Sequence, residues 1–306
     1  MKKKVVVIVG PTASGKTALS VELAKKIDGE IISSDSMQIY KDMNIGTAKV
    51  TKDEMQGIKH YLVDFVSPNE RYTVSDFKSD CEKAIEEIIS HKKVPIIVGG
   101  TGLYVDSIVN SIEYANMQFD EKYRNELMEK AGNPQELDKM WKKALEIDPL
   151  AMKKISSNDK KRIIRVLEIY KATGKTKTQL EIESRKKTSR YDFKIFGITM
   201  DRQILYDRIN RRVDLMIENG LENEVKEILQ KYEKFPTAMQ GIGYKEVVQY
   251  FNGNISRQEM IDKIKQESRR YAKRQLTWFR RNKEIIWLDS NENTIQYNIE
   301  RIIEEL

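Results

Sequence analysis

Residues 10–17 read Gly-Pro-Thr-Ala-Ser-Gly-Lys-Thr and satisfy the pattern G-x-x-x-x-G-K-[ST]. The apolar run 5–9 precedes them and the amphipathic run 16–27 follows, which is the strand, loop and helix order of a phosphate-binding loop. In such a loop, backbone N–H groups at a helix N-terminus surround phosphate oxygens, Lys16 adds positive charge, and Thr17 offers a hydroxyl to Mg²⁺. The pattern predicts Mg²⁺ as the cofactor and phosphate binding by Gly10, Pro11, Thr12, Ala13, Ser14, Gly15, Lys16 and Thr17.

The same alternation continues beyond this phosphate loop (residues 10–17). Apolar runs at 30–33 and 95–98 flank a helical pattern at 73–91, which indicates parallel strands covered by helices. Strand signals are absent from 113–191 and return at 194–200 and 285–288; the patterns at 202–218, 221–232 and 256–281 are helical. We therefore expect an α/β fold. Its catalytic core, a parallel sheet with a phosphate loop, comprises 1–112 and 192–306, and an all-helical insertion comprises 113–191.

Composition excludes several kinds of site. The 306 residues include one cysteine, Cys81, and two histidines, His60 and His91, so neither an internal disulfide nor a structural zinc site is expected. No run approaches the roughly 18 uninterrupted apolar residues of a membrane span, and no cleavage site follows the basic N-terminus. We expect a cytoplasmic protein whose chemistry uses carboxylates, backbone amides and cations.

Positive charge is concentrated in two segments. The net charge is +7 overall, +8 over residues 153–187 and +6 over 257–284, which leaves −7 for the rest of the chain. Two basic segments in an otherwise acidic chain are typical of a protein that binds a polyanion such as a nucleic acid. Two solvated helix faces are the alternative interpretation.

Polar residues follow two of the predicted strands. Asp35 comes shortly after the run 30–33, and Thr101 follows Gly99 and Gly100 at the end of 95–98. Residues just past the carboxyl ends of parallel strands face the ligand crevice, so Asp35 is expected near the bound phosphates. Thr101 can hydrogen-bond a ligand there, and a simple flexible loop is the alternative interpretation of 99–104. Asp35 is a candidate general base or indirect Mg²⁺ ligand; a helix N-cap or turn is its alternative role.

Six motifs in order resemble the bacterial tRNA dimethylallyltransferases. They are GPTASGKT at 10–17, SSDSMQIY at 33–40, GTAK at 46–49, VGGTGLY at 98–104, GIGYKE at 241–246 and KRQLTWFRR at 273–281. The resemblance implies transfer of a dimethylallyl group from dimethylallyl diphosphate to N6 of the adenosine immediately 3′ of the anticodon. It also implies Mg²⁺, a helical insertion that holds the anticodon stem-loop, and a monomer.

The resemblance assigns roles to individual residues. The base falls on Asp35, the contact to the acceptor adenosine on Thr101, and the diphosphate contacts on Lys16 and Arg212, with Arg208 one turn earlier as an alternative. The predicted tRNA contacts are Asp35, Ser36, Met37, Gln38, Thr101, Arg124, Lys161, Arg162, Arg165, Gln240, Gly241, Gly243, Tyr244, Lys245, Lys273, Arg274, Gln275 and Arg280. The aromatic residues Tyr271, Trp278 and Phe279 lie among these cations and are candidate platforms for base stacking. Tyr271 and Phe279 recur at helical spacing with Ile261, Ile264 and Leu276, which favours the core for them instead.

Other functions fit part of the pattern. A small-molecule kinase with a phosphate loop would use the same loop and Asp35 to activate a hydroxyl. A nucleic-acid-binding protein could use the loop as a nucleotide switch, and an adenine-nucleotide prenyltransferase would use a free nucleotide as acceptor. None of these three needs both the phosphate loop with Asp35 and the two basic segments.

Overall fold

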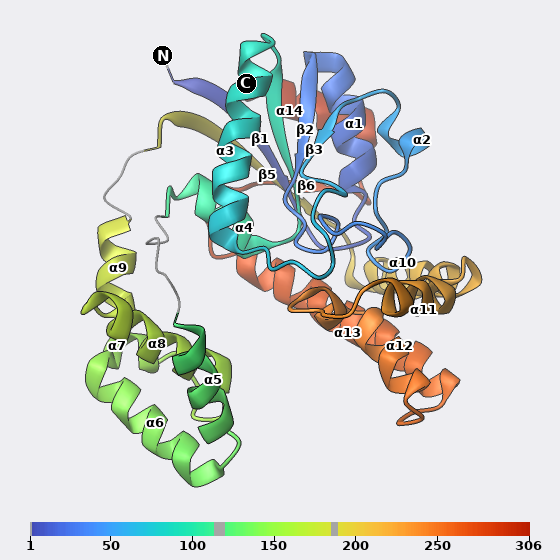
Figure 1. The fold of residues 1–306 in the computed structure, drawn as a ribbon. Helices are drawn as coiled ribbons and strands as arrows, with labels where there is room; N and C mark the ends of the chain where they lie inside the picture. The colour runs from blue at the N-terminus through green and yellow to red at the C-terminus, as the bar shows by residue number, and fades with distance from the viewer. Residues whose placement is uncertain (1, 113–119, 185–188) are drawn as a thin grey trace. The chain divides into compact units, whose positions relative to one another are not determined.

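The computed structural model describes residues 2–112, 120–184 and 189–306, which form two compact units (Figure 1). The core unit comprises Met1–Ile108 and Arg190–Leu306, and the insertion unit comprises Val109–Ser189. The expected boundary at residue 113 lies outside the described residues, and the one at 191 lies beside the observed division. The inserted segment thus interrupts a core built from both ends of the chain.

In the described part of the core unit, a six-stranded, all-parallel sheet forms the centre, in the order β3-β2-β4-β1-β5-β6. The strands are β1 (Lys3–Val9), β2 (Gly29–Ser33), β3 (His60–Tyr61), β4 (Val94–Gly99), β5 (Tyr191–Thr199) and β6 (Ile286–Asp289). The central strands β1, β2 and β4 carry nearly continuous runs of buried residues. This burial explains why they appear as apolar runs rather than alternating patterns.

Helices cover both faces of this sheet (Figure 1). On one face, α1 (Lys16–Ile27) and α14 (Ile295–Glu304) pack on a core that includes Val6, Ile8 and Ile96. On the other lies α3 (Val74–Ser90), whose Thr73 hydroxyl accepts the N–H of Asp76 in a capping box. Because helices cover both faces, a ligand can reach the sheet at the carboxyl ends of its strands.

The helices after β5 form a second apolar cluster in the core unit. They are α10 (Arg202–Glu218), α11 (Leu221–Lys231), α12 (Tyr244–Phe251) and α13 (Arg257–Phe279), with a short 3₁₀ turn at Ala238–Gln240. Their apolar side chains pack with those of the segment that follows β2, including Ile39, Tyr40 and Met43. Short helices α2 (Lys52–Met55) and α4 (Gly102–Val109) complete the unit.

The described part of the insertion unit is helical. It contains α5 (Glu121–Lys130), α6 (Pro134–Ile147), α7 (Pro149–Met152), α8 (Lys160–Thr173) and α9 (Lys177–Ser184). The buried faces of α5, α6 and α8 share one apolar core, with Ile163 and Ile164 fully buried in it. None of the helices in the described residues of either unit is long and apolar enough to cross a lipid bilayer.

The α/β expectation is confirmed, and most element bounds lie within a few residues of those predicted. The helices 16–27 and 202–218 are observed with the same ends. The sequence prediction omitted β3, α2, α4, α12 and α14. A two-residue strand carries no periodic signal, whereas the helical spacing of Ile295, Ile299 and Ile302 was an available signal for α14.

Candidate active site

The loops after β1, β2 and β4 meet because these strands are neighbours in the sheet. A cavity of about 1010 Å³ opens beside them within the core unit. Its walls include these predicted site residues: Thr12, Ala13, Ser14, Gly15, Lys16, Thr17, Asp35, Ser36, Met37, Gln38, Arg208, Arg212, Gln240, Gly241, Lys245, Arg274 and Gln275. The structure therefore brings together most of the predicted residues of the core unit.

The phosphate loop presents donors to this cavity. Gly15 has φ of 89°, a left-handed conformation that favours glycine, and no side chain caps the N-terminus of α1. The buried Ser14 hydroxyl lines the cavity and has no hydrogen-bond partner within the described residues. Uncapped N–H groups at a helix N-terminus and a hydroxyl without a partner are suited to an anion such as a diphosphate.

Three charged side chains influence one another at the loop. Burial lowers the pKa of Lys16 to about 8, an effect that the Asp35 carboxylate opposes and the Arg212 guanidinium increases. Burial likewise lowers the pKa of Arg212, and Asp35 again opposes the shift. Two partly buried cations near one carboxylate make the site electropositive, so a bound anion would favour the charged forms of Lys16 and Arg212, which burial disfavours.

Arg212, rather than Arg208, is tied to the phosphate loop. Its Nη1 donates to the hydroxyl of Thr12 at 3.0 Å, and its Nη2 donates to the carbonyl of Thr47 at 3.4 Å. Arg208 also lines the cavity but is exposed on α10. The geometry favours Arg212 as the arginine that contacts phosphate oxygens.

Asp35 and Thr101 are linked through Ser36. Asp35 accepts the N–H of Met37 at 2.9 Å through Oδ1, which fixes the carboxyl group after β2. The hydroxyl of Thr101 accepts the N–H of Ser36 at 3.1 Å and donates to the Ser36 hydroxyl at 3.3 Å. The two predicted catalytic groups therefore lie on loops that are hydrogen-bonded to each other.

Helix α13 contributes a buried side-chain amide to the site. Gln275 is 5% exposed; its Oε1 accepts the N–H of Thr12 at 2.9 Å and its Nε2 donates to the carbonyl of Gly100 at 3.0 Å. Both ends of its amide are bonded within the protein, so Gln275 links the phosphate loop to the turn at Gly100, and its role as a tRNA contact stays a prediction. Tyr271, expected in the core, lines the cavity, and burial followed by the nearby Asp35 charge raises its pKa to about 12.

The remaining aromatic and basic residues of α13 divide by exposure. Phe279 is buried as predicted, and Trp278 is half-buried, its Nε1 donating to Asp106 at 2.9 Å. The basic residues predicted to contact tRNA are exposed; these are Lys273, Arg274 and Arg280.

The motif at 241–246 is more buried than its predicted role requires. Tyr244 is fully buried and donates to the carboxylate of Glu224 at 2.6 Å, and its role as a tRNA contact stays a prediction. Gly241 and Gly243 are also buried, although Gly241 lines the cavity. Gln240 is exposed and Lys245 half-buried, and both line the cavity.

In the insertion unit, the predicted contacts differ in availability. The Nη1 of Arg124 donates to both oxygens of the buried Glu168 carboxylate, at 2.9 and 3.0 Å. This ion pair gives Arg124 a structural role, because leaving Glu168 unpaired would be costly. Lys161 and Arg162 are exposed in the first turn of α8, and Arg165 is half-buried on the same helix.

The described residues hold no cluster of three or more His, Cys, Asp or Glu side chains that could bind a metal ion. Thr17 is exposed at the cavity wall and can supply one hydroxyl oxygen. One protein oxygen with diphosphate oxygens and water is a donor set that suits Mg²⁺, so the residues present fit this ion when a diphosphate is bound.

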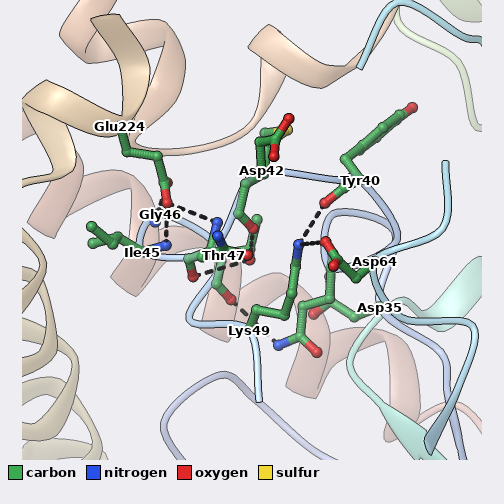
Figure 2. Close-up of polar contacts among 12 residues, drawn as sticks. Asp35, Tyr40, Asp42, Ile45, Gly46, Thr47, Lys49, Asp64 and Glu224 are labelled. Atoms are coloured by element: carbon green, nitrogen blue, oxygen red, sulfur yellow. Dashed lines mark hydrogen bonds and ion pairs between the residues drawn. The ribbon is translucent and has the colours of Figure 1, made fainter. Parts of the chain in front are cut away.

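One part of the wall was assigned no role from the sequence. Residues 44–50 line the cavity. Glu224 accepts hydrogen bonds from the N–H groups of Asn44, Ile45 and Gly46 (Figure 2). The motif GTAK marked part of this loop, but Glu224 lies 180 residues after Asn44 in the sequence. No local pattern connects the two, and Glu224 could only be found in the folded chain.

Comparison with known proteins shows relatives along nearly the whole chain. The family model described as IPP transferase matches residues 38–282. A tRNA dimethylallyltransferase of Carboxydothermus hydrogenoformans is 48% identical over 305 residues, covering 100% of this chain and 98% of the relative. One from Acetivibrio thermocellus is 49% identical over 292 residues, covering 94% of this chain and 92% of the relative.

Solved structures agree with these sequence matches. The full-length tRNA isopentenylpyrophosphate transferase of Bacillus halodurans has 42% identity and a TM-score of 0.74, and the match covers 100% of this chain and 95% of that protein. A eukaryotic dimethylallyltransferase acting on tRNA has 31% identity and a TM-score of 0.79, and the match covers 98% of this chain and 78% of that protein. Family match, identity and shared fold extend over nearly all of this chain, which belongs to the IPP transferase family.

Proposed function

We propose that the protein transfers a dimethylallyl group from dimethylallyl diphosphate to tRNA, at N6 of the adenosine immediately 3′ of the anticodon. One observation carries the proposal: Asp35, Lys16 and Arg212 line one cavity with the phosphate loop. The names of the relatives, tRNA dimethylallyltransferase at 48–49% identity, indicate the substrate class.

The arrangement supplies help at both ends of the reaction. The N6 amine attacks the allylic carbon, the carbon–oxygen bond to the diphosphate breaks, and the electron pair of that bond leaves with pyrophosphate. The loop N–H groups, Lys16 and Arg212 stabilise the charge that the leaving group gains, and one preorganised donor of this kind typically contributes about 3 kcal/mol. Asp35 takes the proton that the amine loses, a general-base contribution of about 10²- to 10⁴-fold.

Positioning supplies the rest. Thr101, which is hydrogen-bonded to Ser36 beside Asp35, would contact the acceptor adenosine. The base must leave its stack to enter the cavity, at a cost of a few kcal/mol that is lower in a single-stranded loop than in a helix. We propose Mg²⁺ as the cofactor, held through the Thr17 hydroxyl; when bound, it would neutralise diphosphate charge.

The phosphates of the RNA meet exposed basic residues on two parts of the chain. On α13 these are Lys273, Arg274 and Arg280, and on α8 they are Lys161 and Arg162. A small-molecule kinase or a free-nucleotide prenyltransferase would have no use for them.

Incubation of the purified protein with Mg²⁺ and radiolabelled dimethylallyl diphosphate tests the proposal. We expect label on a tRNA that carries adenosine 3′ of the anticodon, recovered after nuclease digestion as N6-(dimethylallyl)adenosine, and none on the same tRNA with guanosine there. Label on free AMP but not on tRNA would contradict the proposal in favour of a nucleotide prenyltransferase. ATP-dependent phosphorylation of a small hydroxyl compound without prenyl transfer would favour a kinase.

A further inference from the structure

The loop 44–49 is held by a single buried carboxylate. Glu224, 8% exposed on α11, accepts the N–H of Asn44 at 2.8 Å and of Ile45 at 2.7 Å through Oε2, and the N–H of Gly46 at 3.1 Å through Oε1 (Figure 2). The Tyr244 hydroxyl donates a fourth hydrogen bond at 2.6 Å. Successive backbone N–H groups that converge on one site form an anion-binding nest, and here a side chain of the protein fills it.

The packing behind this nest fixes its shape. Burial, together with the Glu224 carboxylate, raises the pKa of Tyr244 above its usual value, which keeps the hydroxyl a donor. The ring of Tyr244 lies against Gly46, where an added Cβ would come within 2.5 Å of it. The loop also closes on itself, with the N–H of Lys49 bonded to the carbonyl of Asn44 at 2.9 Å. These contacts therefore hold the loop in one conformation.

The outer side of the loop presents carbonyl groups to residues of the cavity. The Ala48 carbonyl accepts from Nε2 of Gln38 at 3.0 Å, and the Thr47 carbonyl accepts from Nη2 of Arg212 at 3.4 Å. Nη1 of Arg212 is bonded to Thr12 of the phosphate loop. Two hydrogen bonds, to Thr12 and to Thr47, therefore orient the Arg212 guanidinium, and displacement of the loop 44–49 would remove the one to Thr47.

We propose that Glu224 is a positioning residue of the transfer reaction, because it fixes the position of the loop 44–49. The carbonyls of this loop then orient Arg212 towards the diphosphate and Gln38 towards the acceptor. The proposal rests on the proposed function, because it requires that Arg212 bind the diphosphate. Glu224 itself touches neither substrate. Its effect is transmitted through three backbone N–H groups, a charge-assisted set that a neutral amide would hold more weakly.

The test uses Glu224→Gln, with inorganic pyrophosphate and Mg²⁺ as the probe in calorimetric titration well below the melting temperature. We expect pyrophosphate to bind at least about tenfold more weakly than to wild type, with the far-UV circular dichroism unchanged. Glu227→Gln is the matched control, since it removes the same charge from an exposed position of α11 and should bind as wild type does.

A double-mutant cycle separates positioning from general destabilisation. If Glu224 acts through Arg212, the losses of pyrophosphate affinity in Glu224→Gln and Arg212→Lys should be clearly less than additive when combined. Additive losses, or wild-type affinity in folded Glu224→Gln, would overturn the inference even if the melting temperature fell. Failure of the wild-type protein to bind pyrophosphate would instead overturn the proposed function and the inference with it.

Tyr244→Phe covers the case in which Glu224→Gln does not fold. It keeps the ring against Gly46 and removes one of the four hydrogen bonds to the carboxylate. We expect about threefold weaker pyrophosphate binding, a smaller loss of the same kind. Wild-type affinity in Tyr244→Phe, with Glu224→Gln unfolded, would assign Glu224 to folding alone and overturn the inference.

Discussion

Gln275 joins α13 to the phosphate loop through Thr12: its side-chain carbonyl accepts the Thr12 N–H at 2.9 Å, across 263 residues of sequence. The amide nitrogen of the same side chain donates to the carbonyl of Gly100, which immediately precedes Thr101. One buried amide thus fixes the loop that would hold the diphosphate relative to the turn that would contact the acceptor.

Gln275→Glu should separate this linking role from tRNA binding. A carboxylate keeps the bond to Thr12 but cannot donate to Gly100, and one unsatisfied buried group costs about 1–3 kcal/mol. We expect kcat to fall about 10- to 100-fold, with the Kd for tRNA changed less than about threefold. Gln266→Glu, exposed on the same helix, is the control. A loss of tRNA affinity as large as the loss of kcat would instead show that Gln275 contacts the RNA.

Asp35→Asn should lose turnover and keep tRNA. Asparagine retains an acceptor for the Met37 N–H but cannot take a proton at neutral pH, so kcat should fall about 10²- to 10⁴-fold. Single-turnover rates and filter-binding affinities for tRNA measure the two effects, with Asp53→Asn, exposed on α2, as the control. Equal losses of rate and affinity would mean that Asp35 is a binding residue.

Pyrophosphate affinity should depend on the protonation of Lys16. Its pKa is lowered to about 8, so the ammonium is charged below that pH and neutral above it in the free protein. A bound anion favours the charged form, so binding above pH 8 must take up a proton and the Kd should rise by up to about tenfold per pH unit.

Titration of pyrophosphate itself also affects that profile. Arginine stays charged throughout the range, so Lys16→Arg retains only the contribution of the ligand and should not show the rise in Kd above pH 8. Calorimetry in two buffers of different ionisation enthalpy measures the proton uptake directly. Parallel pH profiles for wild type and Lys16→Arg would refute the assignment to Lys16.

Charge reversal on α8 should weaken tRNA binding in a salt-dependent way. Lys161→Glu with Arg162→Glu removes two exposed cations, and each RNA phosphate that they no longer neutralise should reduce the slope of log K against log salt by about 0.7–0.9. Fluorescence titrations from low to moderate salt measure that slope. Lys142→Glu, an exposed lysine of α6, is the control. An unchanged slope would mean that this face of α8 is only solvated.

Arg124→Ala should act on tRNA binding through stability, because Arg124 pairs with the buried Glu168. Arg124→Ala would leave a buried carboxylate unpaired, and breaking such a pair typically destabilises a protein by about 3–5 kcal/mol. We expect a lower melting temperature in circular dichroism, and any decrease in tRNA binding should follow the unfolding of the insertion unit. Unchanged stability with reduced tRNA affinity would instead support Arg124 as an RNA contact.

The sequence by itself determined the parts of this protein that depend on neighbouring residues. The phosphate loop between an apolar strand and a helix, Asp35 and Thr101 at strand ends, the helical insertion and the two basic segments are all patterns within short windows. Buried parallel strands and amphipathic helices show their periodicity directly, which is why 16–27 and 202–218 were predicted with the observed ends.

Only the tertiary structure decided which polar side chains serve the fold. Tyr244 and Gln275 stand in motifs that suggest RNA contact, yet both are buried, and their partners Glu224 and Thr12 lie 20 and 263 residues away. Glu224 in turn holds a loop 178–180 residues earlier. Burial and hydrogen bonding at such separations depend on how the sheet and helices pack, and packing leaves no local signal in the sequence.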